Sequence, residues 1–133
     1  MTLNQKMKKP IFTNKAPAAI GPYSQAVQWG DVVFISGQIP LIPETGELNN
    51  STFEDEANQV IDNLEAICKE AGGNLDHILK LTIYLTDLSR FGVVNEIMAA
   101  RFSEPFPARA TVEISKLPKE VNIEMDAILS IAT

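Results

Sequence analysis

An arginine and a glutamate near the end of the chain are the residues best suited by type and spacing to do chemistry. Arg109 follows a segment with two prolines, residues 105–108, and Glu124 comes fifteen residues after it. Prolines hold a backbone extended, and the alternation that follows predicts a strand with Ala110, Val112 and Ile114 on one face. Arg109, Thr111 and Glu113 then share the other face. An arginine that binds a carboxylate and a glutamate that orients and deprotonates water would make a minimal hydrolytic site for a small organic acid.

The chemistry expected of each residue has a simpler alternative. A guanidinium binds a carboxylate through two parallel hydrogen bonds, which is worth about 1.5–3 kcal/mol net. Arg109 could equally form a salt bridge to Glu113 or another acid on the sheet. A glutamate that orients and deprotonates water contributes about 10²–10⁴-fold to a rate, but Glu124 could be a solvated strand residue. Pattern alone leaves both alternatives open.

Composition restricts the class of protein. The chain has 133 residues, which predicts one domain over residues 1–133 that needs neither disulfide nor metal to fold. One cysteine and one histidine cannot supply a usual metal site, so we expect none. A net charge of −6 argues against nucleic-acid binding. No apolar run is long enough to cross a membrane, and the basic start lacks the apolar core of a secretory signal. We therefore expect a cytoplasmic protein.

The remaining sequence predicts the elements that position the pair. Residues 1–10 are expected to be a loose N-terminal leader, with Met1 or Met7 as the start. Strands are predicted at 26–29, 31–36, 78–86 and 123–131, and helices at 53–71 and 89–102. The order β-β-α-β-α-β-β predicts an α+β fold with both helices on one face of the sheet. The polar face of 78–86 then lacks a cover within the chain, which suggests that other subunits close it.

The first helix has the clearest signals. Thr52 can cap its start, with Asp55 three residues on, and Gly72-Gly73 should end it. Cys68 lies on its apolar stripe, so we expect a buried, inert thiol. In the second helix, Asn95 lies within the stripe formed by Phe91, Val94, Met98 and Phe102 and would need a partner if buried.

Common catalytic motifs are absent from the sequence. It contains no Gly-x-Ser-x-Gly elbow, no phosphate-binding loop and no Gly-x-Gly-x-x-Gly fingerprint. His77 follows an aspartate near the start of a strand and is expected at the surface. The Arg109 and Glu124 pair is what remains.

Five motifs in order resemble the YjgF/RidA family, the reactive-intermediate imine deaminases. They are Gly21-Pro22-Tyr23-Ser24-Gln25-Ala26, Phe34-Ile35-Ser36-Gly37-Gln38-Ile39-Pro40, Val94-Asn95, Phe106-Pro107-Ala108-Arg109-Ala110-Thr111-Val112-Glu113, and Leu117-Pro118-Lys119 through Ile123-Glu124. The likeness runs from about Met7 to Ala132. It implies a chorismate-mutase-like mixed sheet with two helices on one face, assembled as a homotrimer with clefts between neighbouring subunits. It also implies that the last strand lies between the 32–36 and 78–86 strands.

The resemblance also implies roles for single residues. Arg109 resembles the family's carboxylate anchor, and Glu124 resembles its water-orienting acid. Five further residues match positions that bind the substrate or line the cleft: Tyr23, Ser36, Gly37, Asn95 and Thr111. Thr111 stands where many relatives have a cysteine, which leaves imine hydrolysis intact but removes thiol chemistry. For Tyr23 and Asn95, a packing aromatic and a buried structural amide remain alternatives.

The implied activity is hydrolysis of 2-imino acids, such as 2-iminopropanoate and 2-iminobutanoate, to 2-oxo acids and ammonia. Such a reaction needs no cofactor and protects pyridoxal-phosphate enzymes from reactive intermediates. The implied partners are small 2-imino or 2-oxo acids and two further copies of the chain, with no nucleic acid and no membrane. Two alternatives stay open: a non-catalytic sensor of such acids, and the endoribonuclease or translation-inhibitor activity described for some relatives. A chaperone-like holdase is a weaker third.

Overall fold

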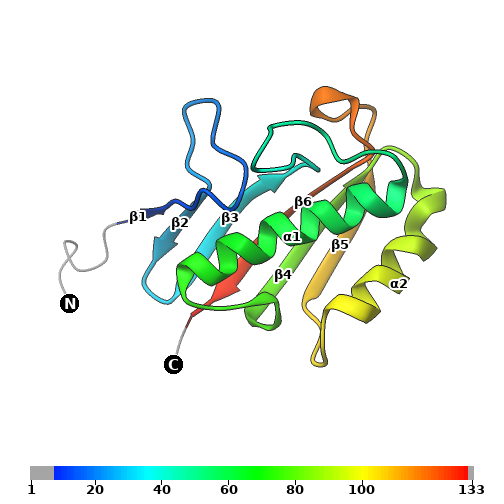
Figure 1. Ribbon diagram of the computed structural model, residues 1–133. Coiled ribbons are helices and arrows are strands. Elements are labelled where there is room, and N and C mark those ends of the chain that lie inside the picture. Colours follow the sequence, from blue (N-terminus) through cyan, green and yellow to red (C-terminus); the bar gives the residue numbers. More distant parts are fainter. Residues whose placement is uncertain (1–7, 132–133) are drawn as a thin grey trace.

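A single mixed sheet with two helices on one face forms the domain in the computed structural model, which describes residues 8–131 (Figure 1). The strand order is β1-β2-β3-β6-β4-β5. The strands are β1 Lys9–Ile11, β2 Ala26–Trp29, β3 Val32–Gln38, β4 Ile78–Leu85, β5 Ala108–Glu113 and β6 Ile123–Ser130. The helices are α1 Phe53–Ala71 and α2 Phe91–Arg101, with short 3₁₀ turns at Leu75–His77, Leu88–Arg90 and Pro118–Glu120. The predicted fold class is confirmed.

Helix α1 begins and ends where the sequence predicts. The Thr52 side chain accepts a hydrogen bond from the backbone N–H of Asp55 at 3.0 Å. Gly72 ends the helix in the left-handed conformation, with φ of 99°, which glycine adopts without strain. Cys68 is buried, as predicted, and burial raises the pKa of its thiol to about 12.

The last strand lies inside the sheet. β6 pairs antiparallel with both β3 and β4, and β5 pairs parallel with β4 at the sheet edge. A parallel neighbour requires a crossover, which α2 provides between β4 and β5 (Figure 1). The expectation that the last two strands are not neighbours is confirmed.

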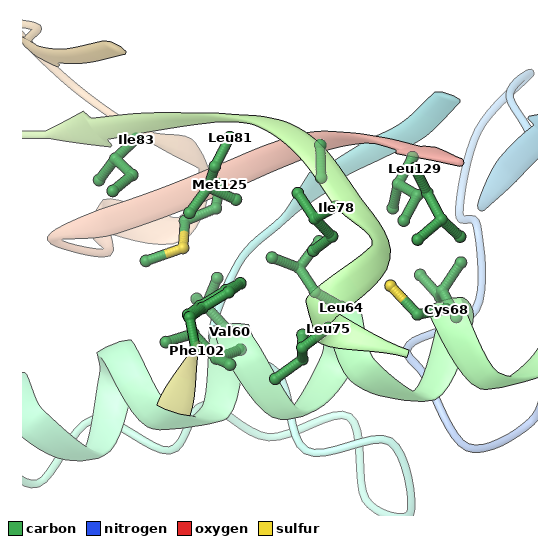
Figure 2. Close-up of a cluster of buried hydrophobic side chains, with 14 of the residues drawn as sticks. Val60, Leu64, Cys68, Leu75, Ile78, Leu81, Ile83, Phe102, Met125 and Leu129 are labelled. Atoms are coloured by element: carbon green, nitrogen blue, oxygen red, sulfur yellow. The ribbon is translucent and has the colours of Figure 1, made fainter. Parts of the chain in front are cut away.

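The core lies between α1 and the sheet. Figure 2 shows Leu81, Ile83 and Met125 directed from the sheet toward the helix, where they meet Leu64 and Val60. All five are fully buried. Because successive strand residues point to opposite faces, this row of buried side chains fixes which residues of β4 and β6 face away from the helices.

Two local predictions are wrong. Alternation along residues 78–86 predicts Leu79 on the apolar face with Leu81, but a register shift between Ile78 and Lys80 turns Ile78 inward and leaves Leu79 exposed. Lys9 and Pro10, expected in a loose leader, belong to β1 and pair with Gln28 and Val27. The rest of the predicted leader is residues 1–8. Residues 1–7, which include both candidate starts, lie outside the described residues.

The side chains of β5 are divided between its two faces as the alternation predicts. Arg109, Thr111 and Glu113 align with the buried Leu81, Ile83 and Leu85 of β4 and therefore lie on the helix side. The apolar residue Val112 points to the other face and is 41% exposed. Polar residues can occupy the helix side of β5 because β5 is the edge strand, where the side chain of Arg109 extends past the core to α2.

The sheet face away from the helices carries apolar side chains that the described chain does not cover. Phe34 at its centre is 51% exposed, and Val112 lies on the same face. No helix among residues 8–131 has both the length and the apolar character that a membrane crossing requires.

Candidate active site

Arg109 is exposed and is held by α2. Its Nη1 donates to Asn95 Oδ1 at 2.5 Å and contacts Met98 Sδ at 3.6 Å. The guanidinium carbon lies 4.8 Å from the centre of the Phe91 ring, a cation–π geometry. Both contacts use Nη1, so the Nε–Nη2 edge remains available for a planar anion. Among residues 8–131 no acid pairs with Arg109, because Glu113 instead accepts from the backbone N–H of Leu88 at 2.9 Å.

Glu124 is half-buried on the other face of the sheet, against the backbone of Gly37. A Cβ at position 37 would overlap the Glu124 carboxylate, so only glycine leaves room for it there. The pairing of β3 with β6 shifts between Ile35 and Gln38, and this irregularity places Gly37 beside the carboxylate. Burial raises the pKa of Glu124, and the nearby negative charge of Asp126 raises it further.

A cleft of about 570 Å³ opens at Glu124. Tyr23, Ser36 and Gly37 line it together with Glu124, so four of the seven predicted site residues meet there. The Ser36 hydroxyl donates to the carbonyl of Ser24 at 2.6 Å, which fixes the turn and leaves the serine oxygen able to accept. The rest of the wall includes Pro17, Ala18, Ile20, Ile39, Leu41, Pro118 and Lys119.

The loop that carries this wall is fixed by a buried glutamine. Gln25 accepts from the backbone N–H of Thr13 at 2.8 Å, and its amide donates to the carbonyls of Thr13, Ala16 and Pro17 at 2.9, 3.3 and 2.8 Å. These bonds hold the loop before β2 in one conformation. The cleft wall is therefore held by side-chain bonds rather than by a regular element.

A second cleft, of about 430 Å³, opens at Arg109. Asn95, Met98, Ala99, Phe106 and Pro107 line it with the arginine. Asn95 is exposed and its Oδ1 accepts a hydrogen bond from Arg109, so the alternative of a buried structural amide is wrong. The proline segment before β5 forms one wall, as its place next to Arg109 in the sequence suggests.

The predicted pair is not assembled within one chain. Arg109 aligns with Leu81 on the helix side of the sheet, whereas Glu124 aligns with Tyr84 on the uncovered side. The two clefts have no lining residue in common. Thr111 lies in neither cleft; its Oγ1 is buried and has no hydrogen-bond partner among the described residues. One chain thus has two separate clefts, called half-sites from here on: one opens at the Arg109 guanidinium and the other at the Glu124 carboxylate.

Several residues of the two half-sites were not found from the sequence. Phe91 was expected to point inward, yet it is exposed and stacks on the Arg109 guanidinium. Met98 supplies both core packing and a contact to Arg109. Lys119 lines the Glu124 cleft from a turn in which it adopts a left-handed backbone, with φ of 55°. The only sequence signal for this turn is Pro118, which directly precedes Lys119 in the short connection between β5 and β6.

Metal binding is not indicated by the side chains. Among residues 8–131 no three His, Cys, Asp or Glu side chains gather as metal ligands would. The polar groups of the two clefts are a guanidinium, a carboxylate, hydroxyls, an amide and an ammonium. These groups can bind an organic acid and move protons.

Comparison with known proteins gives one family. The pattern of the endoribonuclease L-PSP family matches residues 13–131. A RutC family protein of Pyrococcus abyssi is 50% identical over 121 residues, which cover 91% of this chain and 95% of that protein. Reactive Intermediate Deaminase A, chloroplastic, of Arabidopsis thaliana is 44% identical over 124 residues, which cover 93% of this chain and 66% of that protein.

Solved structures share the fold closely. The crystal structure of RidA from an Antarctic Psychrobacter has a TM-score of 0.89 and 50% identity, over 92% of this chain and 99% of that one. The crystal structure of Escherichia coli TdcF with bound serine has a TM-score of 0.86 and 39% identity, over 93% of this chain and 99% of that one.

Proposed function

We propose that this chain, which belongs to the endoribonuclease L-PSP or YjgF/RidA family, hydrolyses reactive 2-imino acids to 2-oxo acids and ammonia. The observation that carries the proposal is the pair of half-sites. One presents a guanidinium edge that fits a carboxylate, and the other presents a carboxylate of raised pKa in a cleft. A 2-imino acid needs both, because it has an anionic end and an electrophilic carbon next to it. The serine-bound relative has a ligand with the same kind of carboxylate.

Assembly brings the half-sites together in this proposal. The protein forms a homotrimer in which the Arg109 cleft of one subunit faces the Glu124 cleft of the next. Arg109 lies at the sheet edge and Glu124 on the uncovered face, so a neighbouring subunit that packs its β5 edge against that face joins them. The exposed Phe34 and Val112 on that face support such packing, since an apolar sheet face is covered in most proteins.

The reaction follows from these positions. Arg109 binds the substrate carboxylate through two parallel hydrogen bonds, with Asn95 and Phe91 fixing the guanidinium plane. The imine carbon then faces water at Glu124. Glu124 accepts a proton as the water oxygen attacks, and it returns a proton to the nitrogen. The carbinolamine collapses when its hydroxyl loses a proton to Glu124, the C–N bond breaks, and ammonia leaves with the proton that Glu124 returns.

The finer features are also part of the proposal. The substrates are 2-iminopropanoate and 2-iminobutanoate, formed from enamines that pyridoxal-phosphate dehydratases release, and their removal protects such enzymes. Tyr23, Ser36 and Gly37 surround the substrate on one side and Asn95 on the other, and Thr111 lies behind the site, two residues after Arg109 on the same face of β5. No cofactor takes part. The protein acts in the cytoplasm, as a single domain without a nucleic-acid or membrane partner.

A coupled assay tests the proposal. A threonine or serine dehydratase generates the imine, and its decay is followed with and without the protein. Faster release of 2-oxo acid that is abolished by Arg109→Ala supports the deaminase. Binding of 2-oxo acids with an unchanged rate of imine decay would instead identify a sensor. Cleavage of RNA that survives purification and is lost in Arg109→Ala would identify the ribonuclease that the family description names; the net charge of −6 weighs against that outcome.

A further inference from the structure

Helix α1 carries two buried polar residues that the proposed reaction does not use. Glu56 is 2% exposed and Asn63 is 1% exposed. They lie two turns apart along the helix, so both side chains leave α1 on the same side. Buried polar groups are hydrogen-bonded in folded proteins. Both of these residues find partners outside the helix, in or directly beside segments that line the Glu124 cleft.

Asn63 holds the segment that follows β3. Its Nδ2 donates to the carbonyls of Ile39 and Leu41, at 3.2 and 3.0 Å. Only the NH₂ end of an amide can donate to two carbonyls. The other end is also used, because Oδ1 accepts from Gln59 Nε2 at 3.0 Å. Ile39 and Leu41 line the cleft, so Asn63 fixes this wall through the backbone on both sides of Pro40.

Glu56 holds the segment that enters β6. Its Oε1 accepts from the backbone N–H of Asn122 at 2.9 Å, and its Oε2 accepts from Asn122 Nδ2 at 2.7 Å. Asn122 comes directly before β6 and two residues before Glu124. Its carbonyl accepts from the backbone N–H of Thr86 at 3.3 Å. The start of β6 is thereby bonded both to α1 and to the residue that follows β4.

The turn before Asn122 has a backbone that needs such support. Lys119 and Glu120 adopt left-handed conformations, with φ of 55° and 57°. Residues other than glycine keep this conformation only where the surrounding structure holds them in it, and such residues gather at functional sites. Pro118 and Lys119 line the Glu124 cleft. The bonds from Glu56 to Asn122 therefore hold the end of a strained turn that forms a second wall.

We propose that Glu56 and Asn63 are positioning residues of the Glu124 cleft, through which α1 fixes two of its walls. This inference rests on the proposed function. Asn63 acts through Ile39 and Leu41, whose apolar side chains contact the side chain of the 2-imino acid, so it sets the chain length that fits. Glu56 acts at the start of β6, so it sets where the Glu124 carboxylate meets the reacting carbon.

Binding of stable 2-oxo acids tests Asn63 without turnover. Titration calorimetry gives the Kd values of 2-oxobutanoate and 2-oxohexanoate, whose ratio reports how well the cleft distinguishes chain length. Asn63→Ala leaves two carbonyls without their donor, so this ratio should change about 10-fold, the effect of a methylene in an apolar pocket. Val60→Ala is the matched control, because Val60 lies on the same helix but packs in the core (Figure 2). It should lower the Tm and leave the ratio unchanged.

A double-mutant cycle shows whether Asn63 acts through the wall. Leu41→Ala removes a side chain of the wall itself. The effect of Asn63→Ala on the ratio should then be smaller in the Leu41→Ala protein than in wild type, because the two residues are coupled. Fully additive effects, or an unchanged ratio in Asn63→Ala, would overturn the inference.

The division between kcat and KM tests Glu56. Glu56→Leu leaves the Asn122 donors without an acceptor, so kcat should fall about 10- to 100-fold while KM changes little, as expected when the reacting groups are misplaced by about 1 Å. Glu56→Gln keeps one acceptor oxygen, so its kcat should lie between those of wild type and Glu56→Leu. Equal kcat values in the three proteins would overturn the role of Glu56.

Failure of the proposed function gives a different result. A wild-type protein that binds both 2-oxo acids but hydrolyses no imine would refute the deaminase, and the Kd ratio would still decide the role of Asn63. Hydrogen exchange at the Asn122 amide would then decide the role of Glu56: it should be faster in Glu56→Leu and unchanged in Val60→Ala. A wild-type protein that binds neither acid would overturn this inference together with the proposed function.

Discussion

Arg109 and Glu124 lie on opposite faces of the same six-stranded sheet. The arginine aligns with the buried Leu81 on the helix side, and the glutamate aligns with Tyr84 on the uncovered side. Each residue nevertheless opens into a cleft of its own with the polar groups that its proposed role needs. In the proposed trimer, the Arg109 cleft of one subunit and the Glu124 cleft of its neighbour form one site.

The planar edge of Arg109 is expected to matter more than its charge. Arg109→Lys keeps the charge but loses the paired hydrogen bonds, so kcat/KM should fall about 10- to 100-fold, the equivalent of roughly 1.5–3 kcal/mol. Arg90→Lys is a matched control, because Arg90 also stacks on a ring, that of Phe53 at 4.6 Å, but lies in neither cleft. Steady-state kinetics of the two variants should differ; equal losses would argue against carboxylate binding by Arg109.

Gly37 is expected to be required for the placement of Glu124. In Gly37→Ala the new Cβ would overlap the carboxylate, and a displacement of about 1 Å can cost on the order of 10²-fold in rate. Gly92→Ala is the control, because a Cβ at that α2 position meets nothing within 4 Å. Turnover of Gly92→Ala should match wild type. Full activity in Gly37→Ala would show that Glu124 need not occupy its observed position.

Glu124 is expected to lower stability at neutral pH. Its pKa is raised in the folded protein, so the folded state binds more protons than the unfolded state between the ordinary glutamate pKa and the raised one. Stability is then full below the ordinary pKa and is lost as pH rises through the raised one. Glu124→Gln should therefore have a higher Tm than wild type at neutral pH, with a difference that disappears in acid. Thermal unfolding across pH measures this, and a constant difference would contradict it.

Cys68 should be inert in the folded protein. Burial raises the pKa of its thiol to about 12, so almost no thiolate forms at neutral pH. An alkylating reagent should leave the native protein unmodified and label it once in denaturant, as mass spectrometry would show. Rapid labelling of the native protein would mean that α1 opens from the sheet.

The sequence predicts elements well where local signals decide. The Thr52 cap, the Gly72 end and the stripe that buries Cys68 all lie within one helix, and each is confirmed. The prediction for Leu79 was wrong because an irregularity in the strand pairing changes which residues face the core. The prediction for Phe91 was wrong because its partner, Arg109, lies on a strand that is distant in the sequence. Both depend on contacts between elements.

The sequence and the family likeness name the candidate site residues but not their geometry. Alternation predicts which residues share a face within β5 and within β6. Whether Arg109 and Glu124 lie on the same face of the sheet depends on how each strand is aligned with β4. No pattern in either segment encodes those registers. The family likeness supplied the position of β6 and the residues, whereas the placement of Arg109 and Glu124 on opposite faces required the structure.

The most direct test of the account is subunit complementation. Arg109→Ala and Glu124→Gln subunits, each inactive alone, are mixed in equal amounts by unfolding and refolding, and mixed trimers are verified by native mass spectrometry. If each site takes Arg109 from one subunit and Glu124 from its neighbour, about a quarter of all sites regain both residues, and imine hydrolysis should return to roughly a quarter of the wild-type rate. Verified mixed trimers without any activity would contradict a site shared between subunits.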